Sequence, residues 1–218
     1  MNKRCIVSFA TGRYNTILDR LIESWRPYSD TIDFLYYRDE YPEGCPTHQE
    51  IPYAFKSFCI KEAIEQGYTS ILWMDSAVWI QKDIIPLFEQ IEKEGYLIFR
   101  NGWTQANWST DTQLEAFGYS RDEAESMPHP MACVIGFQVN DQTIDFIHDY
   151  VNKYPLFVGS WNNTGNVCSQ DLRCLGSRHD QTILGFIAHQ YGLQMTNTEG
   201  LISYNIEDKN SILLSQGI

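Results

Sequence analysis

Basic residues are scarce in this sequence. Its 16 Lys and Arg residues stand against 28 Asp and Glu residues, which gives a formal net charge of −12 at pH 7. Nucleic-acid-binding proteins need a basic surface that neutralises phosphates, so we expect no nucleic-acid partner. A smaller anionic substrate would require local neutralisation by a Lys, an Arg or a metal ion.

Long apolar runs are also missing. No segment is long enough to span a membrane, and the first apolar run, CIVSFA at 5–10, is too short for a signal peptide. The 6 cysteines include no Cys-x-x-Cys pair, which argues against a zinc module. We therefore expect a cytoplasmic chain with reduced thiols, although Cys168 and Cys174 are placed so that they can bridge a loop.

Two common phosphate-binding motifs are absent as well. The chain contains neither Gly-x-Gly-x-x-Gly nor Gly-x-x-x-x-Gly-Lys-Ser/Thr, so the dinucleotide fingerprint and the P-loop are excluded. A carboxylate that holds a divalent metal ion, which in turn holds a diphosphate, is another way to bind a nucleotide.

The remaining pattern is that of one α/β domain over residues 1–218. Apolar runs predict strands at 4–10, 32–38, 69–74, 96–100, 132–140 and 193–197. Amphipathic segments predict helices at 16–25, 53–67, 82–95, 141–154 (capped by Asp141) and 180–192, with short helices within 110–127. This alternation favours a mainly parallel or mixed central sheet flanked by helices.

Polar clusters follow three of the predicted strands, at 11–15, 75–77 and 100–103. In open α/β sheets, ligands bind beyond the carboxyl ends of the strands. We therefore expect these clusters to converge on one site.

Five pieces of the chain, in this order, carry a resemblance to a known family. They are IVSFATGRYN at 6–15, Lys56, ILWMDSAVWI at 71–80, ACVIGFQVN at 132–140 and RHDQTILG at 178–185. Together they resemble nucleotide-sugar-dependent glycosyltransferases of the Rossmann-like GT-A fold, in particular the small domains encoded by large algal viruses and phages. The resemblance covers roughly residues 4–197.

The resemblance implies a donor-binding role for the first loop. In the family this loop embraces the nucleoside, usually uridine, and the matching residues are Ala10, Thr11, Gly12, Arg13 and Tyr14. Tyr14 would stack on the base and Arg13 would reach a phosphate. The alternative is an ordinary strand-to-helix turn.

Lys56 matches a basic residue that approaches the donor in the family. The alternative for Lys56 is a solvated helix lysine.

The resemblance also implies a metal site. The family motif is Asp-x-Asp, and this chain has Asp75-Ser76-Ala77, so the second carboxylate is missing. We expect Asp75, helped by Ser76, to hold a Mn²⁺ or Mg²⁺ ion, with His179 or Asp180 as further candidate ligands. The alternative is that Asp75 only caps a turn.

Further residues match the family's donor-sugar pocket. Met131, Ala132, Cys133 and Gly136 lie in the strand that lines the sugar, and simple strand packing is the alternative. Asp180 and Gln181 open the last long helix, where the family places a carboxylate and an amide near the reacting carbon. The alternative for Asp180 is a helix N-cap.

Aromatic residues indicate where an acceptor sugar binds. Trp103 and Trp108 lie with Gln105 and Asn107 in a predicted loop, and rings with amides suit a sugar face. The segment 161–165 is a candidate lid.

The predicted function is metal-assisted transfer of a hexose or deoxyhexose from a UDP-sugar to a hydroxyl of a glycan or glycoprotein. The Asp180-Gln181 pair that opens the last long helix resembles that of retaining members of the family, so the resemblance implies retention of anomeric configuration. The missing second acid leaves open a catalytically inactive nucleotide-sugar-binding or structural domain of the same fold. A nucleotidyltransferase is disfavoured because its first loop would be richer in Gly and Lys/Arg.

Overall fold

The computed structural model describes residues 2–216, so residues 1, 217 and 218 of the predicted domain lie outside the described residues. The strands are β1 (Arg4–Ala10), β2 (Asp33–Arg38), β3 (Ser70–Met74), β4 (Val78–Ile80), β5 (Tyr96–Thr104), β6 (Pro128–Gln138), β7 (Ile202–Ser203) and β8 (Leu213–Ser215). The α-helices are α1 (Tyr14–Trp25), α2 (Phe55–Glu65), α3 (Ile85–Glu94), α4 (Asp111–Phe117), α5 (Arg121–Ala124), α6 (Asp141–Asn152) and α7 (Asp180–Gln190). Short 3-10 helices span Arg26–Tyr28, Tyr154–Leu156 and Thr164–Asn166.

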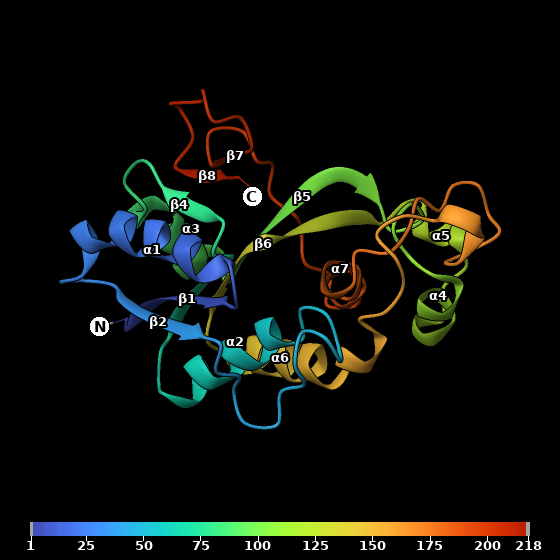
Figure 1. Cartoon of the computed structure of the whole chain (residues 1–218), viewed down its shortest axis with the longest axis horizontal. Helices are drawn as coiled ribbons and strands as arrows, with labels where there is room; N and C mark the ends of the chain where they lie inside the picture. The colour runs from blue at the N-terminus through green and yellow to red at the C-terminus, as the bar shows by residue number, and fades with distance from the viewer. Residues whose placement is uncertain (1, 217–218) are drawn as a thin grey trace.

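The central sheet has the strand order β2-β1-β3-β6-β5 (Figure 1). β1 pairs in parallel with β2 and β3, whereas β6 runs antiparallel to both β3 and β5. The prediction of an α/β fold with a mixed central sheet is confirmed. The carboxyl ends of β1 and β3 meet the amino-terminal half of β6 at one edge of the sheet.

The two faces of the sheet are covered by different helices. Alternate residues of β1 enter opposite cores, with Val7 and Phe9 on one side and Ile6 and Ala10 on the other. The first core is closed by residues of α2, α6 and α7, and the second by residues of α1 and α3. Figure 1 shows α1 and α3 on one side of the sheet and α2 and α6 on the other. Burial on both faces explains the near-continuous apolar runs of β1 and β3.

The predictions for the segment after α7 and for the N-cap of α6 are wrong. The segment 193–197 is not a strand, because Thr196 makes only one isolated parallel bridge, with Phe99. The N-cap of α6 is Asn140, whose side chain accepts a hydrogen bond from the Thr143 amide, so Asp141 is the first helical residue instead.

A small second sheet with the order β4-β8-β7 was not predicted. β4 is antiparallel to β8, and β7 is parallel to β8. Its strands have only two or three residues each, which is too short for a readable hydrophobic period. In addition, β4 pairs with β8, which lies far from it in sequence. In Figure 1, β4 lies beside α1, and β7 and β8 belong to the C-terminal segment drawn in red.

All six cysteines are free, so a Cys168–Cys174 bridge does not form. The Cys168 thiol lies at the backbone of Ser160, and the Cys174 thiol lies at the carbonyl oxygen of Ser109. Within residues 2–216, no helix combines the length and the hydropathy needed to cross a membrane.

Candidate functional site

Two adjoining hollows open at the edge of the sheet where β1 and β3 end. Phe9, Ala10, Thr11, Tyr14, His48, Tyr53, Phe55, Asp75, Ser76 and Ala77 line the first hollow. Tyr53, Lys56, Asp75, Ala77, Asn101, Trp103, Trp108, Ala132, Cys133, Trp161, Arg178, Asp180, Gln181, Tyr204 and Ser215 line the second. Tyr53, Asp75 and Ala77 belong to both, so the hollows form one continuous groove.

Asp39 holds the first loop in place. Its Oδ1 accepts a hydrogen bond from the Gly12 amide at 2.8 Å, and its Oδ2 accepts one from Asn15 Nδ2 at 2.6 Å. These hydrogen bonds lower the pKa of Asp39, with the Gly12 amide as the largest cause. Asp39 follows β2, so the parallel pairing of β1 with β2 brings it to this loop. No local sequence motif indicates this anchoring role.

The predicted first-loop residues do not all face the groove. Ala10, Thr11 and Tyr14 line the first hollow. Arg13 is exposed, with its guanidinium 5.6 Å from the centre of the Tyr14 ring, and it lines neither hollow.

Lys56 joins three predicted parts of the site. Its Nζ lies 2.8 Å from Oδ2 of Asp180 and 3.2 Å from Oδ1 of Asp75, and it donates a hydrogen bond to the Ala132 carbonyl oxygen at 2.7 Å. Lys56 is 2% exposed, which rules out the solvated-lysine interpretation.

The two aspartates keep the Lys56 ammonium group protonated and charged. Burial opposes the charge of the ammonium, but Asp180 and Asp75 outweigh it and raise the pKa of Lys56. The pKa of Asp180 is also raised, chiefly by burial, with Lys56 acting in the opposite direction. The cluster therefore carries a cation held between two acidic groups, at the junction of the hollows.

Asp75 faces the groove. Its amide donates to the Cys133 carbonyl oxygen at 2.8 Å, and its Oδ1 accepts a hydrogen bond from Trp73 Nε1 at 2.7 Å. Its side chain is 34% exposed, unlike that of Asp180 at 5%. Ser76 and Ala77 continue into the first hollow.

We tested the donor set for a divalent metal ion. Asp75 Oδ1 is engaged by Trp73 and Lys56, whereas its Oδ2 accepts no hydrogen bond from any residue in 2–216. No group of three or more His, Cys, Asp or Glu side chains in that range is placed to hold a metal ion. Among the described residues, Asp75 Oδ2 is therefore the carboxylate oxygen of this cluster that is left available to a ligand.

His179 lies among aromatic rings. Its ring stacks on Tyr53 at 5.9 Å and meets Trp161 edge-on at 5.5 Å. It is 4% exposed, and neither ring nitrogen has a hydrogen-bond partner among the described residues. Burial is the main cause that lowers its pKa to about 4, so the ring is neutral at pH 7.

The backbone is strained at His179 and at Tyr53, whose rings stack on each other. His179 has φ 53° and ψ −116°, and Tyr53 has φ 64°. Residues other than glycine rarely adopt such angles, and they persist where the surrounding structure enforces them, often at functional sites. His179 is also the N-cap of α7, so Asp180 is not the cap but the first helical residue.

A buried histidine positions two amide side chains of the second hollow. The Nδ1 atom of His129 lies 2.9 Å from Asn101 Nδ2 and 3.2 Å from Gln181 Nε2. His129 is fully buried, and burial is the main cause that lowers its pKa to about 3. A neutral ring accepts at Nδ1, so we assign the proton to Nε2 and donor roles to both amides. His129 lies outside every segment predicted to form the site, whereas Asn101 belongs to the polar cluster at 100–103 that was expected to converge there.

The two predicted acceptor tryptophans lie together. Trp103 and Trp108 meet edge-on with ring centres 6.0 Å apart, and both line the second hollow. Trp103 is not in a loop as predicted, because β5 continues to Thr104. Gln105 is fully buried and donates to the Thr182 carbonyl oxygen at 3.1 Å, so it does not face an acceptor.

The strand β6 contributes only part of its predicted residues. Ala132 and Cys133 line the second hollow, whereas Met131 lies in an adjoining hollow with Asn101 and Tyr204. Gly136 faces the core, where an added Cβ would lie 2.4 Å from Ile91 Cδ1. Its small size serves packing rather than approach of a sugar.

Arg178 and Tyr204 also line the second hollow, although neither was predicted as a site residue. The Arg178 guanidinium carbon lies 3.9 Å from the centre of the Trp108 ring and 4.5 Å from that of Trp161. The Tyr204 hydroxyl lies 3.3 Å from Cys133 Sγ and closes one side of the groove. No local motif marks Tyr204, because only the return of the C-terminal segment places it beside β6.

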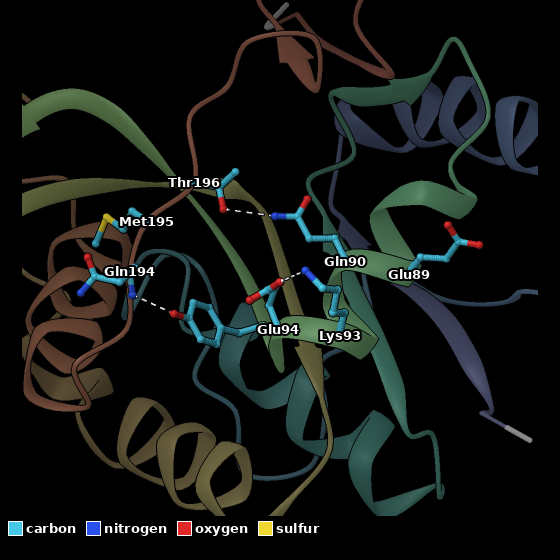
Figure 2. Close-up of a pocket in the computed structure, with 8 residues that line it drawn as sticks. Glu89, Gln90, Lys93, Glu94, Gln194, Met195 and Thr196 are labelled. Carbon is cyan, nitrogen blue, oxygen red and sulfur yellow. Dashed lines mark hydrogen bonds and ion pairs between the residues drawn. The ribbon is translucent and has the colours of Figure 1, made fainter.

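Figure 2 shows a separate hollow between α3, the start of β5 and the segment after α7. Its polar groups are largely paired with one another. For example, Lys93 pairs with Glu94 at 2.6 Å, and the backbone N–H of Gln194 donates to the Tyr96 hydroxyl at 2.8 Å. It contains none of the predicted site residues.

Comparison with solved structures identifies the fold. A glycosyltransferase involved in glycosylation of the major capsid of the virus PBCV-1 superposes with a TM-score of 0.57 at 14% identity, covering 98% of this chain and 92% of that chain. The fold is that of a glycosyltransferase. The glycosyltransferase GlyE of Streptococcus pneumoniae TIGR4 superposes with a TM-score of 0.52 at 14% identity, covering 91% of this chain and 46% of that one.

No protein-family model and no curated protein sequence matches the chain. At this level of identity, the likeness to solved structures establishes the glycosyltransferase fold, and activity has to be argued from the site.

Proposed function

We propose that this protein transfers a hexose or deoxyhexose from a UDP-sugar to a hydroxyl group of a glycan or glycoprotein. The observation that carries the proposal is the junction at Lys56, which binds Asp75 and Asp180 together in the groove. That junction lies between a hollow formed by the first loop and a hollow lined by tryptophans.

The first hollow suits the nucleoside. Tyr14, His48 and Tyr53 offer aromatic faces, and Ala10, Thr11 and Ala77 leave room beside them. A base stacks on such rings whatever its identity, so uridine would be selected by polar contacts from the loop backbone. The diphosphate then extends towards Asp75, where the hollows meet.

A divalent ion fits this arrangement through Asp75 Oδ2. When bound, it would neutralise the negative charge that develops on the diphosphate leaving group. The chain's own contribution at that point is to orient the Asp75 carboxylate, through the Trp73 indole and Lys56, so that one oxygen is left for the ligand.

The distribution of carboxylates supports retention of configuration. Asp75 and Asp180 are the only carboxylates that line the two hollows in the described chain, and both are paired with Lys56. An inverting enzyme needs a free general base for the acceptor hydroxyl. The Gln181 amide, oriented by His129, would instead face the donor sugar.

The second hollow suits an acceptor sugar. Trp103 is 48% exposed and Trp161 is 46% exposed, so their ring faces are available to the C–H face of a pyranose. Asn101 supplies an amide for the hydroxyl groups.

The test is hydrolysis of UDP-, GDP- and dTDP-sugars with and without Mn²⁺. We expect turnover of a UDP-sugar by the wild type, a loss of at least 100-fold in Asp75→Asn and Asp180→Asn, and no change in Asp30→Asn, which removes an exposed carboxylate outside both hollows. Proton NMR of the released sugar identifies the anomer formed first. An inverted anomer would exclude retention, and no turnover of any donor would exclude the enzyme.

Ala77 favours one alternative, an inactive nucleotide-sugar-binding domain. If the wild type binds UDP-sugar but does not turn it over, Ala77→Asp is the informative variant, because it restores the second carboxylate at the groove. A gain of Mn²⁺-dependent binding in that variant, without turnover, would favour the alternative.

A further inference from the structure

Arg178 is the cation of the groove that has no anionic partner. Its side chain forms no salt bridge and no hydrogen bond with any residue in 2–216, although Lys56 nearby is fully paired. Most other arginines of the chain, such as Arg4, Arg121 and Arg173, are each paired with carboxylates. In a chain with a net charge of −12, an unpaired arginine in the groove is conspicuous.

The surroundings of Arg178 fix its orientation. The guanidinium carbon lies over the Trp108 ring at 3.9 Å and over the Trp161 ring at 4.5 Å. Contact with ring faces engages the π-system of a guanidinium and leaves the N–H groups around its edge free. Burial lowers the pKa of Arg178, and the adjacent ring faces compensate for part of the lost hydration.

We propose that Arg178 binds an oxyanion in the second hollow, either the diphosphate of the donor or a carboxylate carried by an acidic acceptor sugar. This inference rests on the proposed function for the identity of the ligand. A guanidinium edge matches both groups by paired N–H···O bonds, and the tryptophans hold that edge ready before the ligand arrives. Arg178 also places a positive charge in the same hollow as Asp75, where the motif Asp75-Ser76-Ala77 has only one carboxylate to hold a metal ion.

The experiment compares Arg178→Gln with the wild type and with Arg26→Gln. Arg26 is exposed, lies outside both hollows, and its replacement changes the net charge equally. Affinities for UDP, uridine and inorganic pyrophosphate are measured by calorimetry. Binding of methyl glucuronide and methyl glucoside is measured by NMR.

Each outcome decides the proposal. A loss of tenfold or more for UDP and pyrophosphate, with uridine unchanged, supports it and identifies the donor as the source. A tenfold loss for glucuronide, with glucoside unchanged, supports it and identifies an acidic acceptor. Equal losses for charged and uncharged probes, or no loss at all, overturn it, because Arg178 then only braces Trp108 and Trp161.

Failure of the proposed function can be distinguished from failure of the Arg178 proposal. If the wild type binds no UDP, the UDP-sugar assignment is wrong, while pyrophosphate or glucuronide still tests Arg178. Arg178→Lys completes the series, since it keeps the charge but not the paired N–H edge. We expect it to recover at most part of the lost affinity.

Discussion

Lys56 Nζ lies 2.8 Å from Oδ2 of Asp180, although the two residues are far apart in sequence. Both side chains are almost completely buried. The same ammonium reaches Asp75 at 3.2 Å, so α2, the end of β3 and the start of α7 are tied together at one atom. The groove therefore depends on a buried ion cluster for its shape as well as for its chemistry.

Replacing Lys56 should destabilise the fold strongly. In Lys56→Met, two carboxylates would face each other without their shared cation, and removing one partner of a buried ion pair costs about 3 to 5 kcal/mol. Urea unfolding measures the change. Lys61→Met is the matched control in the same helix, because its exposed pair with Glu65 is worth less than about 1 kcal/mol. A small effect of Lys56→Met would contradict the buried cluster.

The positive φ of His179 predicts an unusual ranking of substitutions. Glycine accommodates φ 53° without strain, so His179→Gly should be more stable than His179→Ala by about 1 kcal/mol. At Asp145, an exposed position within α6, the ranking should be reversed, because glycine costs about 1 kcal/mol relative to alanine in a helix. Thermal or urea unfolding of the four variants measures both differences. If alanine were more stable than glycine at His179 as well as at Asp145, the His179 backbone would be shown to be unstrained.

Stability should fall in mild acid because of His179 and His129. Their pKa values are lowered from 6.5 to about 4 and about 3 in the folded protein. Below pH 6.5 the unfolded chain therefore binds protons that the folded chain does not, at a cost of up to about 1.4 kcal/mol per pH unit for each group. The stability that comes from keeping the two histidines neutral is complete above pH 6.5. It is lost as the pH falls towards the folded pKa values of about 4 and about 3.

Unfolding free energies at pH 7.5, 6 and 5 test this pH dependence. His179→Gly should lose less stability between pH 7.5 and pH 5 than the wild type, because one of the two groups is gone. His189→Gln removes an exposed histidine of α7 and serves as the control. Parallel pH profiles for the wild type and His179→Gly would disprove the contribution of His179.

Gly185 should not tolerate alanine. Alanine normally stabilises a helix by about 1 kcal/mol over glycine. Here the added Cβ would lie 1.5 Å from Gln105 Nε2 and 2.7 Å from Pro130 Cδ, so we expect a loss of about 1 to 3 kcal/mol. In a Gln105→Ala background the cost should be smaller, since the nearest obstacle is gone. An equal cost in both backgrounds would place the strain elsewhere.

Local pattern was sufficient for most of the fold. The apolar runs of β1 and β3 and the amphipathic periods of α1, α3 and α6 predicted these elements, because each buries a continuous face. Patterns failed for β4, β7 and β8, which are too short to show a period. They also failed at 193–197, where an apolar segment makes only one bridge to the sheet.

The candidate site divides in the same way. Asp75, Asp180 and Lys56 were predicted as site residues through the resemblance to the glycosyltransferase family, and the structure brings the three side chains together in one groove. Their mutual pairing on one ammonium was not predicted, since no period or spacing encodes which buried charges meet.

Arg178, His129 and Tyr204 were missed because their roles arise from neighbours that are distant in sequence. The sequence by itself determined the α/β layering and which polar residues follow the strands at the edge of the sheet. Only the tertiary structure decided that Lys56 is paired with two carboxylates and that Arg178 has no anionic partner within residues 2–216. The reason is that pairing depends on the distances between side chains, and the packing of α2, β6 and α7 sets these distances.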